Sequence, residues 1–202
     1  TLTLPAEALE VKINPDNPQL GDTVSVTIET DPNDDKPQVT WGNENYPVFA
    51  VGNNQYRALI PTTPLDDSGK VPLIIRGEET TRNFLVWLRD RAFPTQRIWL
   101  SGSSNSPATE LELNRVAEFK KLVTPQQYWN GTFIRPNQGR VSTIFGVRRY
   151  YNGEFAENYY HKGVDYAAGT GSPVVAPASG TVALVGKESE GFRVHGNTVG
   201  ID

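Results

Sequence analysis

The stretch Tyr159-Tyr-His-Lys-Gly-Val-Asp-Tyr-Ala-Ala-Gly-Thr-Gly-Ser-Pro-Val-Val-Ala-Pro177 carries an imidazole and a carboxylate four positions apart. They belong to His161 and Asp165, and His161 is one of only two histidines in the chain. On a straight strand, positions four apart share a face but lie about 13 Å from each other, which is too far for two ligands of one metal ion. Both side chains can bind one ion only if the chain curves between them, and Gly163 is where it can curve.

A neutral imidazole and a carboxylate are ligands that zinc accepts together in a tetrahedron. They do not complete a catalytic zinc site, which usually has three protein ligands and an open water position. The second histidine, His195, stands in a loop sequence without a neighbouring carboxylate, and we predict that it is a surface histidine. By spacing alone, a solvated hydrogen bond between His161 and Asp165 is the alternative to a metal site.

The composition narrows the class of protein. A hydrophobic content of 37% with 10% aromatic residues is typical of a globular chain, and 15 prolines and 18 glycines favour β-structure with many turns. A net charge of −4 argues against nucleic acid as a main partner, because phosphate binding needs a basic face. The absence of cysteine excludes disulfides and thiolate zinc sites, and no apolar run has the length of a membrane span.

The first ninety residues have the pattern of short β-strands separated by turns. Apolar residues in Thr23–Ile28 alternate with period two, which puts Val24, Val26 and Ile28 on one face. Further strands are predicted at Leu9–Ile13, Gln38–Trp41, Tyr46–Val51, Gln55–Ile60, Val71–Ile75 and Asn83–Leu88. Seven short strands at this spacing predict an immunoglobulin-like β-sandwich over residues 1–90, with Trp41 and Trp87 as core anchors.

Residues 91–132 are predicted to form a linker and one connecting helix. Ser101–Pro107 has the composition of a linker, and the helix is expected to begin at an N-cap, either Ser106 or Thr109. For Thr109, Glu112 is the expected partner in a capping box. The helix is predicted to run to about Val123, with an apolar side formed by Leu113, Val116, Phe119 and Val123.

Residues 133–202 change again to glycine-rich β segments. Strands are predicted at Arg140–Phe145, Gly163–Tyr166, Pro173–Ala176, Gly180–Val185 and Asn197–Ile201. The third and fourth of these are expected to form a hairpin through a tight turn at 178–180. The fold class predicted for the whole chain is therefore mainly β: a sandwich, a connecting helix, and an antiparallel β domain.

Three motifs in this last part resemble the start of the lysostaphin-type (LytM-like) zinc peptidase domain. They are Ser142-Thr-Ile-Phe-Gly-Val-Arg148, Tyr160-His-Lys-Gly-Val-Asp-Tyr-Ala-Ala168 and Gly171-Ser-Pro-Val-Val-Ala-Pro-Ala-Ser-Gly-Thr-Val182. They occur in the family's order, and the resemblance covers about Phe133 to Asp202. It implies that His161 and Asp165 bind Zn²⁺, as the His and Asp of the family's H-x-x-x-D motif do.

The resemblance also implies an activity and a setting. The family cleaves peptide cross-links of bacterial peptidoglycan, so a zinc endopeptidase acting on stem peptides is expected, in the periplasm or extracellular cell envelope of a bacterium. A β-rich domain ahead of the peptidase domain resembles secreted envelope members, in which an envelope protein partner is possible. Arg148 is a candidate for binding a stem-peptide carboxylate and Tyr160 for lining the groove, with surface pairing and core packing as the respective alternatives.

The chain departs from the family in one respect. The family takes its third zinc ligand from a later H-x-H motif, and its catalytic histidines from that motif and from an earlier Y-x-H segment. Apart from Tyr159-Tyr-His161, whose histidine is already the predicted first ligand, neither pattern occurs in these 202 residues. We therefore expect the given residues to hold the N-terminal part of the domain, without activity of their own. The alternatives are a non-catalytic LytM-like regulator that binds an amidase or cell-wall fragments, and an adhesion or structural β protein with an incidental His–Asp pair.

Overall fold

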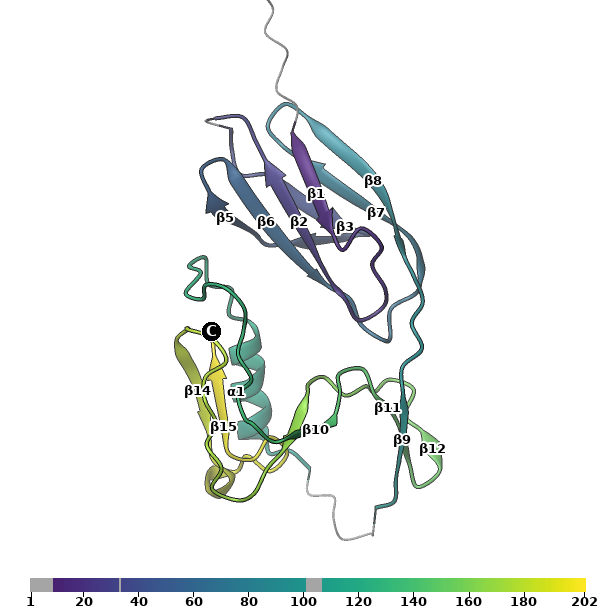
Figure 1. Ribbon diagram of the computed structural model, residues 1–202, viewed down its shortest axis with the longest axis vertical. Helices are drawn as coiled ribbons and strands as arrows, with labels where there is room; N and C mark the ends of the chain where they lie inside the picture. Colours follow the sequence, from purple (N-terminus) through teal and green to yellow (C-terminus); the bar gives the residue numbers. More distant parts are fainter. Residues whose placement is uncertain (1–8, 33, 101–106) are drawn as a thin grey trace, which may run out of the picture. The chain divides into compact units, whose positions relative to one another are not determined.

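The computed structural model describes residues 9–32, 34–100 and 107–202 (Figure 1). The described chain is mainly β, with one α-helix and several antiparallel sheets, which confirms the predicted fold class. No helix in the described ranges is long and apolar enough to cross a membrane. The expected linker at 101–106 and the alternative cap Ser106 lie outside the described residues.

The chain divides into two compact units. The first comprises residues 1–96, 146–148 and 156–162, and the second comprises residues 97–145, 149–155 and 163–202. Two short pieces of the later chain thus belong to the first unit, and one of them contains His161. The domain bounds expected from the sequence, at residues 90 and 132, stay a prediction.

Two four-stranded antiparallel sheets form the body of the first unit. Their strands are β1 (Glu10–Asn14), β2 (Thr23–Glu29), β3 (Gln38–Trp41), β4 (Glu44–Tyr46), β5 (Val48–Gly52), β6 (Gln55–Pro61), β7 (Gly69–Arg76) and β8 (Thr81–Leu88). One sheet has the order β1-β2-β6-β5 and the other β4-β3-β7-β8. Figure 1 shows the two layers. The seven predicted strands are all present, and only the short β4 was not anticipated.

The core between these sheets follows from the period-two pattern. Val24, Val26 and Ile28 on β2 are fully buried, as predicted, because their Cβ atoms all point to the same face of the strand. Buried residues of both sheets join them in one cluster, which includes Val39, Trp41, Val48, Ala58, Ile60, Leu73, Ile75 and Val86. The cluster makes this part of the chain a two-layer β-sandwich with a single core.

Trp87 is a correction to the predicted core. Its neighbours Val86 and Leu88 in β8 are buried, whereas Trp87 itself is 65% exposed. The strand alternation decides this, because Val86 and Leu88 occupy the inward positions and a residue between them must face the other way. Trp41 is buried as expected, so one of the two predicted tryptophan anchors is right and the other is wrong.

The second unit combines a helix with short antiparallel pairs. Its elements are α1 (Glu110–Lys120), β10 (Arg140–Thr143), β12 (Glu154–Phe155), β13 (Asp165–Ala167), β14 (Val182–Gly186), the 3-10 turn η1 (Glu188–Glu190) and β15 (Thr198–Ile201). β10 pairs with β13 and β14 pairs with β15. β9 (Thr95–Ile98), β11 (Arg148–Tyr151) and β12 form a further sheet in the order β12-β11-β9, and none of these three strands was predicted.

Helix α1 begins after Thr109, one of the two predicted N-caps. Thr109 is the N-cap, and its hydroxyl oxygen accepts a hydrogen bond from the Glu112 N–H. The helix ends at Lys120, about one turn before the predicted end. Its buried side contains Glu112 and Val116 with Phe119 partly buried, whereas Leu113 and Val123 are exposed and were assigned wrongly to the apolar side.

The predicted hairpin between 173–176 and 180–185 is wrong. Residues 173–176 form no strand, and β14 pairs with β15 instead. The nearby backbone bonds go elsewhere, since the Val175 N–H donates to Pro136 O and the Ile134 N–H donates to Pro177 O. Pro173 and Pro177 lack N–H donors, which leaves this segment fewer bonds for an antiparallel ladder.

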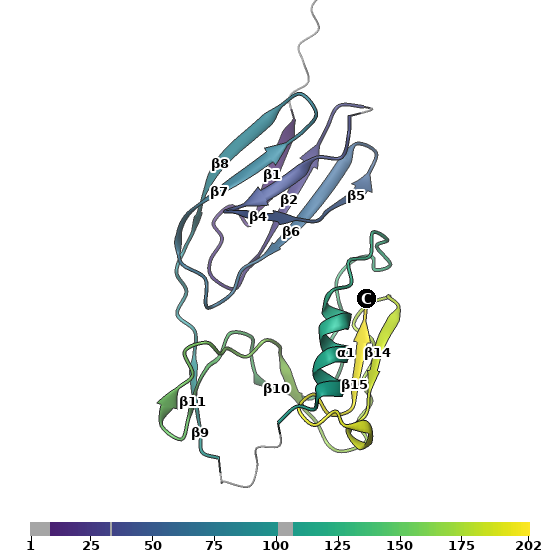
Figure 2. The ribbon, with the colours of Figure 1, turned by 180° about the vertical axis from the view of Figure 1, so that it is seen from behind.

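The core of the second unit forms where α1 packs on the β14–β15 pair (Figure 2). It consists of Val116, Leu184 and Phe192, with Phe119 partly buried against them. Gly200 on β15 makes this packing possible, because a Cβ there would lie 2.8 Å from both the Leu184 Cβ and the Phe119 Cζ. Gly186 has the same role at the Phe192 ring, which a Cβ would approach to 2.3 Å.

Gly200→Ala should destabilise the second unit. The added methyl group forces the Phe119 ring away from β15, and overpacking of this kind costs about 1–3 kcal/mol. Chemical denaturation followed by near-ultraviolet circular dichroism measures the effect. Gly169→Ala is the control, because a Cβ at Gly169 meets nothing within 4 Å. Equal stability of the two variants would show that the ring contact does not constrain position 200.

Candidate functional site

His161 lies in a backbone pairing that the predicted Phe-Gly-Val-Arg motif supplies. The His161 N–H donates to Val147 O at 2.9 Å, and the Gly146 N–H donates to His161 O at 2.8 Å. Val147 is buried, and the Arg148 N–H donates to Pro94 O at 2.9 Å. The motif is thus fixed to the first unit, and it fixes the backbone that carries the imidazole.

Gly146 is needed for this arrangement. Its φ of +88° is in the left-handed region that favours glycine. A Cβ at this position would also lie 2.3 Å from the Phe93 ring. The positive φ and the contact with the Phe93 ring together explain why position 146 of the motif is a glycine.

Arg148 uses its guanidinium to hold the segment before His161. Its Nε donates to Tyr159 O at 2.9 Å and its Nη2 donates to Glu157 O at 2.5 Å. Tyr160 is half-buried, and the Lys162 ammonium lies 5.7 Å from its ring centroid. The predicted role of Arg148 and Tyr160 as substrate contacts stays a prediction. Arg148 has in addition a positioning role that sequence reasoning did not anticipate.

Asp165 is the first residue of β13. It pairs with Thr143 of β10 across a bulge, and the Ser142 hydroxyl lies 3.4 Å from its carbonyl oxygen. Asp165 is exposed, and the chain bends at Gly163, the residue at which curvature was expected. His161 belongs to the first unit and Asp165 to the second.

The donor chemistry of the predicted pair suits zinc. An imidazole and a carboxylate are both ordinary zinc ligands, and glycine at position 163 permits the bend that shared coordination needs. Within the described ranges there is no group of three or more His, Cys, Asp or Glu side chains placed to hold a metal ion. The pair accordingly fits zinc in donor type, and its role as a ligand pair stays a prediction.

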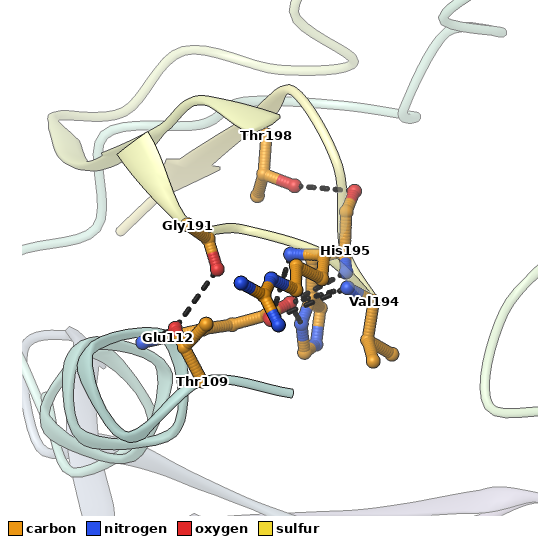
Figure 3. Close-up of polar contacts among 7 residues, drawn as sticks. Thr109, Glu112, Gly191, Val194, His195 and Thr198 are labelled. Atoms are coloured by element: carbon orange, nitrogen blue, oxygen red, sulfur yellow. Dashed lines mark hydrogen bonds and ion pairs between the residues drawn. The ribbon is translucent and has the colours of Figure 1, made fainter. Parts of the chain in front are cut away.

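Glu112 is a densely bonded polar group of the second unit (Figure 3). Its fully buried carboxylate accepts from three consecutive backbone N–H groups, those of Arg193 (2.9 Å), Val194 (3.0 Å) and His195 (2.6 Å). The His195 Nδ1 lies 2.7 Å from the same carboxylate oxygen that its own N–H reaches. The Thr109 hydroxyl adds a bond to Gly191 O at 2.8 Å, so the first turn of α1 is tied to both ends of the 191–195 loop.

This environment keeps Glu112 ionised. Burial alone raises the pKa of the Glu112 carboxyl, but the hydrogen bonds from the His195 backbone and ring, and from the backbone of Val194 and Arg193, outweigh it and lower the pKa to about 2. Because an ionised carboxylate can only accept, the His195 Nδ1 carries the hydrogen of their shared bond. The hydrogen bond therefore fixes the orientation of the His195 ring.

The prediction that His195 lacks a carboxylate neighbour is wrong. The imidazole is 40% exposed, but its partner Glu112 comes from a helix 83 residues earlier in the chain. Sequence reasoning assigned Glu112 to a capping box, and only half of that box forms: Glu112 donates its N–H to Thr109 and turns its carboxylate to the distant loop. The sequence does indicate that Glu112 is buried. It stands four residues before Val116 and seven before Phe119, which puts all three on the same side of the helix.

Among the cavities of the described residues, two open ones lie in the second unit. One, of about 350 Å³, is lined by residues of the 135–139 and 172–175 segments together with Ala168. The other, of about 610 Å³, is lined by residues near Ile134, Pro177 and Ile201. Neither is lined by Glu112 or His195, so the buried carboxylate cluster is separate from both.

A comparison with solved structures finds a protein of similar fold. No family model matches the chain, and no curated protein matches it in sequence. Among solved structures, the crystal structure of a candidate peptidase M23 from Pseudomonas aeruginosa is similar, with a TM-score of 0.56 and 18% sequence identity. The two chains share a fold. The match covers 92% of this chain and 69% of the other, so it takes in both units.

Glu112→Gln should lower the stability of the second unit. The amide keeps the size of the carboxylate but replaces one acceptor oxygen with a donor that faces backbone N–H groups, and it removes the charge that they stabilise. We expect a lower midpoint of thermal unfolding and faster hydrogen exchange at the 193–195 amides. The control is Glu118→Gln, which removes an exposed ion pair with Lys121 on the same helix. Equal effects from the two variants would contradict the role assigned to Glu112.

The same carboxylate should make stability depend on acid pH. Its folded pKa, about 2, lies below the ordinary value of 4.5, so the unfolded chain binds more protons between these values and stability rises with pH there. The contribution is complete above pH 4.5 and is lost as pH falls through about 2. Unfolding free energies measured across this range should show a shallower slope in Glu112→Gln than in the parent, and parallel curves would contradict the assignment.

Proposed function

We propose that the protein is a zinc-dependent endopeptidase that hydrolyses peptide cross-links of bacterial peptidoglycan. The observation that carries the proposal is the fold shared with a candidate peptidase M23 over 92% of the chain. The ordered motifs around His161 and Asp165 support it independently, since they come from the sequence and not from the fold.

His161 and Asp165 are the residues that would hold the metal. A zinc ion held there would supply a Lewis acid for the scissile carbonyl and would activate water as a nucleophile near neutral pH. The described residues of the chain position the two proposed ligands. The pairing of residues 146–148 with 159–161 fixes the backbone of His161, and the β10–β13 pair fixes that of Asp165.

Arg148 and Tyr160 are the proposed contacts for the stem peptide. The two guanidinium bonds to carbonyl oxygens hold Arg148 in one orientation, which reduces the entropy lost when it binds a carboxylate. The half-buried ring of Tyr160 adjoins His161 in the chain and offers an apolar surface beside the metal ligand.

The sandwich of the first unit is proposed to be an immunoglobulin-like module. Its strand order, β1-β2-β6-β5 opposite β4-β3-β7-β8, supports this, because pairing the first strand with the second and the second with a later strand is the arrangement of such sandwiches. A location in the bacterial periplasm or extracellular envelope, with an envelope protein as possible partner, follows from the substrate that we propose.

The test uses protein made from the complete reading frame and purified peptidoglycan. Hydrolysis should stop when a chelator removes the metal and return when zinc is added. His161→Ala and Asp165→Ala should each lose bound zinc and reduce hydrolysis to background. Asp67→Asn, at an exposed turn of the sandwich, is the control and should leave both unchanged.

Three results would count against this function or against its assigned residues. Hydrolysis that survives both the chelator and His161→Ala would exclude a zinc mechanism through this residue. Stoichiometric zinc and binding to wall fragments without release of peptide would favour the non-catalytic regulator. Zinc content that is unaffected by Asp165→Ala would remove Asp165 from the ligand set.

A further inference from the structure

A second candidate binding site lies in the 350 Å³ cavity of the second unit. Its size is in the range of sites for small ligands, and it opens to solvent. Apolar walls come from Pro136, Pro173 and Val175, and polar groups come from Arg135, Asn137 and Ser172. An apolar enclosure with a few convergent polar groups is the usual composition of a ligand site.

Arg135 is the single charged residue among those that line the cavity. Its guanidinium lies 4.9 Å from the centroid of the Tyr166 ring and donates from Nη2 to Gly139 O. Within the described ranges these are its only partners, so one Nη2 bond and a ring contact orient a group that has further N–H donors to offer. A cation at the wall of a cavity without a carboxylate favours an anionic ligand.

The rim around Arg135 is fixed by the chain itself. The Asn137 side chain bridges two segments, since its Nδ2 donates to Pro173 O and its Oδ1 accepts from the Gly139 N–H, both at 2.7 Å. Gly139 approaches so closely that a Cβ would lie 2.3 Å from Ala167 O. The 135–139 segment is therefore held against the end of β13 and the 173 turn, and the cavity is formed before any ligand enters.

We propose that this cavity binds the carboxylate of a short peptide with small aliphatic side chains. The planar fork of Arg135 recognises the carboxylate, and the two prolines and Val175 contact the adjoining side chain. The identification of the peptide as a wall stem peptide rests on the proposed function, whereas carboxylate binding itself does not.

Binding is measured on the full chain by nuclear magnetic resonance and calorimetry, without turnover. The probes are N-acetyl-alanyl-alanine and its C-terminal amide, which differ in the charge that Arg135 would recognise. The acid should shift the amide signals of residues 135–139 and 172–175 and bind at least about tenfold more tightly than the amide. Equal affinities, or shifts confined to other segments, would overturn the proposal.

Three variants sharpen the test. Arg135→Gln should remove the preference for the acid, and Arg135→Lys should retain part of it, because lysine keeps the charge but lacks the fork. Arg140→Gln removes an exposed arginine of β10 that does not line the cavity, and it should bind like the parent. If Arg140→Gln loses as much affinity as Arg135→Gln, the attraction is general surface charge and the assignment to Arg135 is wrong.

The outcome is independent of the peptidase assay. A protein that binds the acid through Arg135 but hydrolyses nothing would keep this site and lose the proposed function. A zinc-dependent peptidase whose Arg135→Gln variant binds both probes like the parent would keep the function and lose this site.

Discussion

The second unit depends on one buried carboxylate. Glu112 replaces solvent for three successive backbone N–H groups and an imidazole, so the 193–195 loop needs no water or other side chain to satisfy them. The loop joins η1 to β15, and β15 packs with β14 against the helix that carries Glu112. The hydrogen bonds of Glu112 therefore stabilise this unit together with its small apolar core of three buried residues.

The sandwich of the first unit is held together by apolar packing and not by a buried charge. Its core is apolar, large and continuous between two sheets, and its order follows from strand alternation. For this reason the sequence predicted it well, since Val24, Val26 and Ile28 show in six residues which face is buried. The same alternation puts Trp87 on the outer face, because it stands between two inward residues, and its aromatic size does not override that position.

The candidate site was predicted in part. Local signals worked: Thr109 is a cap because its hydroxyl acts within one turn, and the Phe-Gly-Val-Arg motif could be picked out from its own residues. Long-range partners were not predictable, since nothing near His195 in sequence reveals a carboxylate 83 residues away. The pairing of residues 146–148 with 159–161, and the role of Arg148 in it, are likewise contacts between loops that have no periodic pattern.

The separation between Glu112 and its partners also sets an order of assembly during synthesis. A ribosome adds about 5–20 residues per second, so roughly 4–17 s pass between the synthesis of Glu112 and that of His195. The sandwich strands are complete by Leu88 and can close in that time, because none of their partners comes later. Helix α1 cannot complete its packing in that time. Until the 193–195 loop is synthesised, the Glu112 carboxylate stays hydrated and Val116 stays exposed to solvent. The nascent second unit is therefore the part of the chain most open to chaperones and proteases.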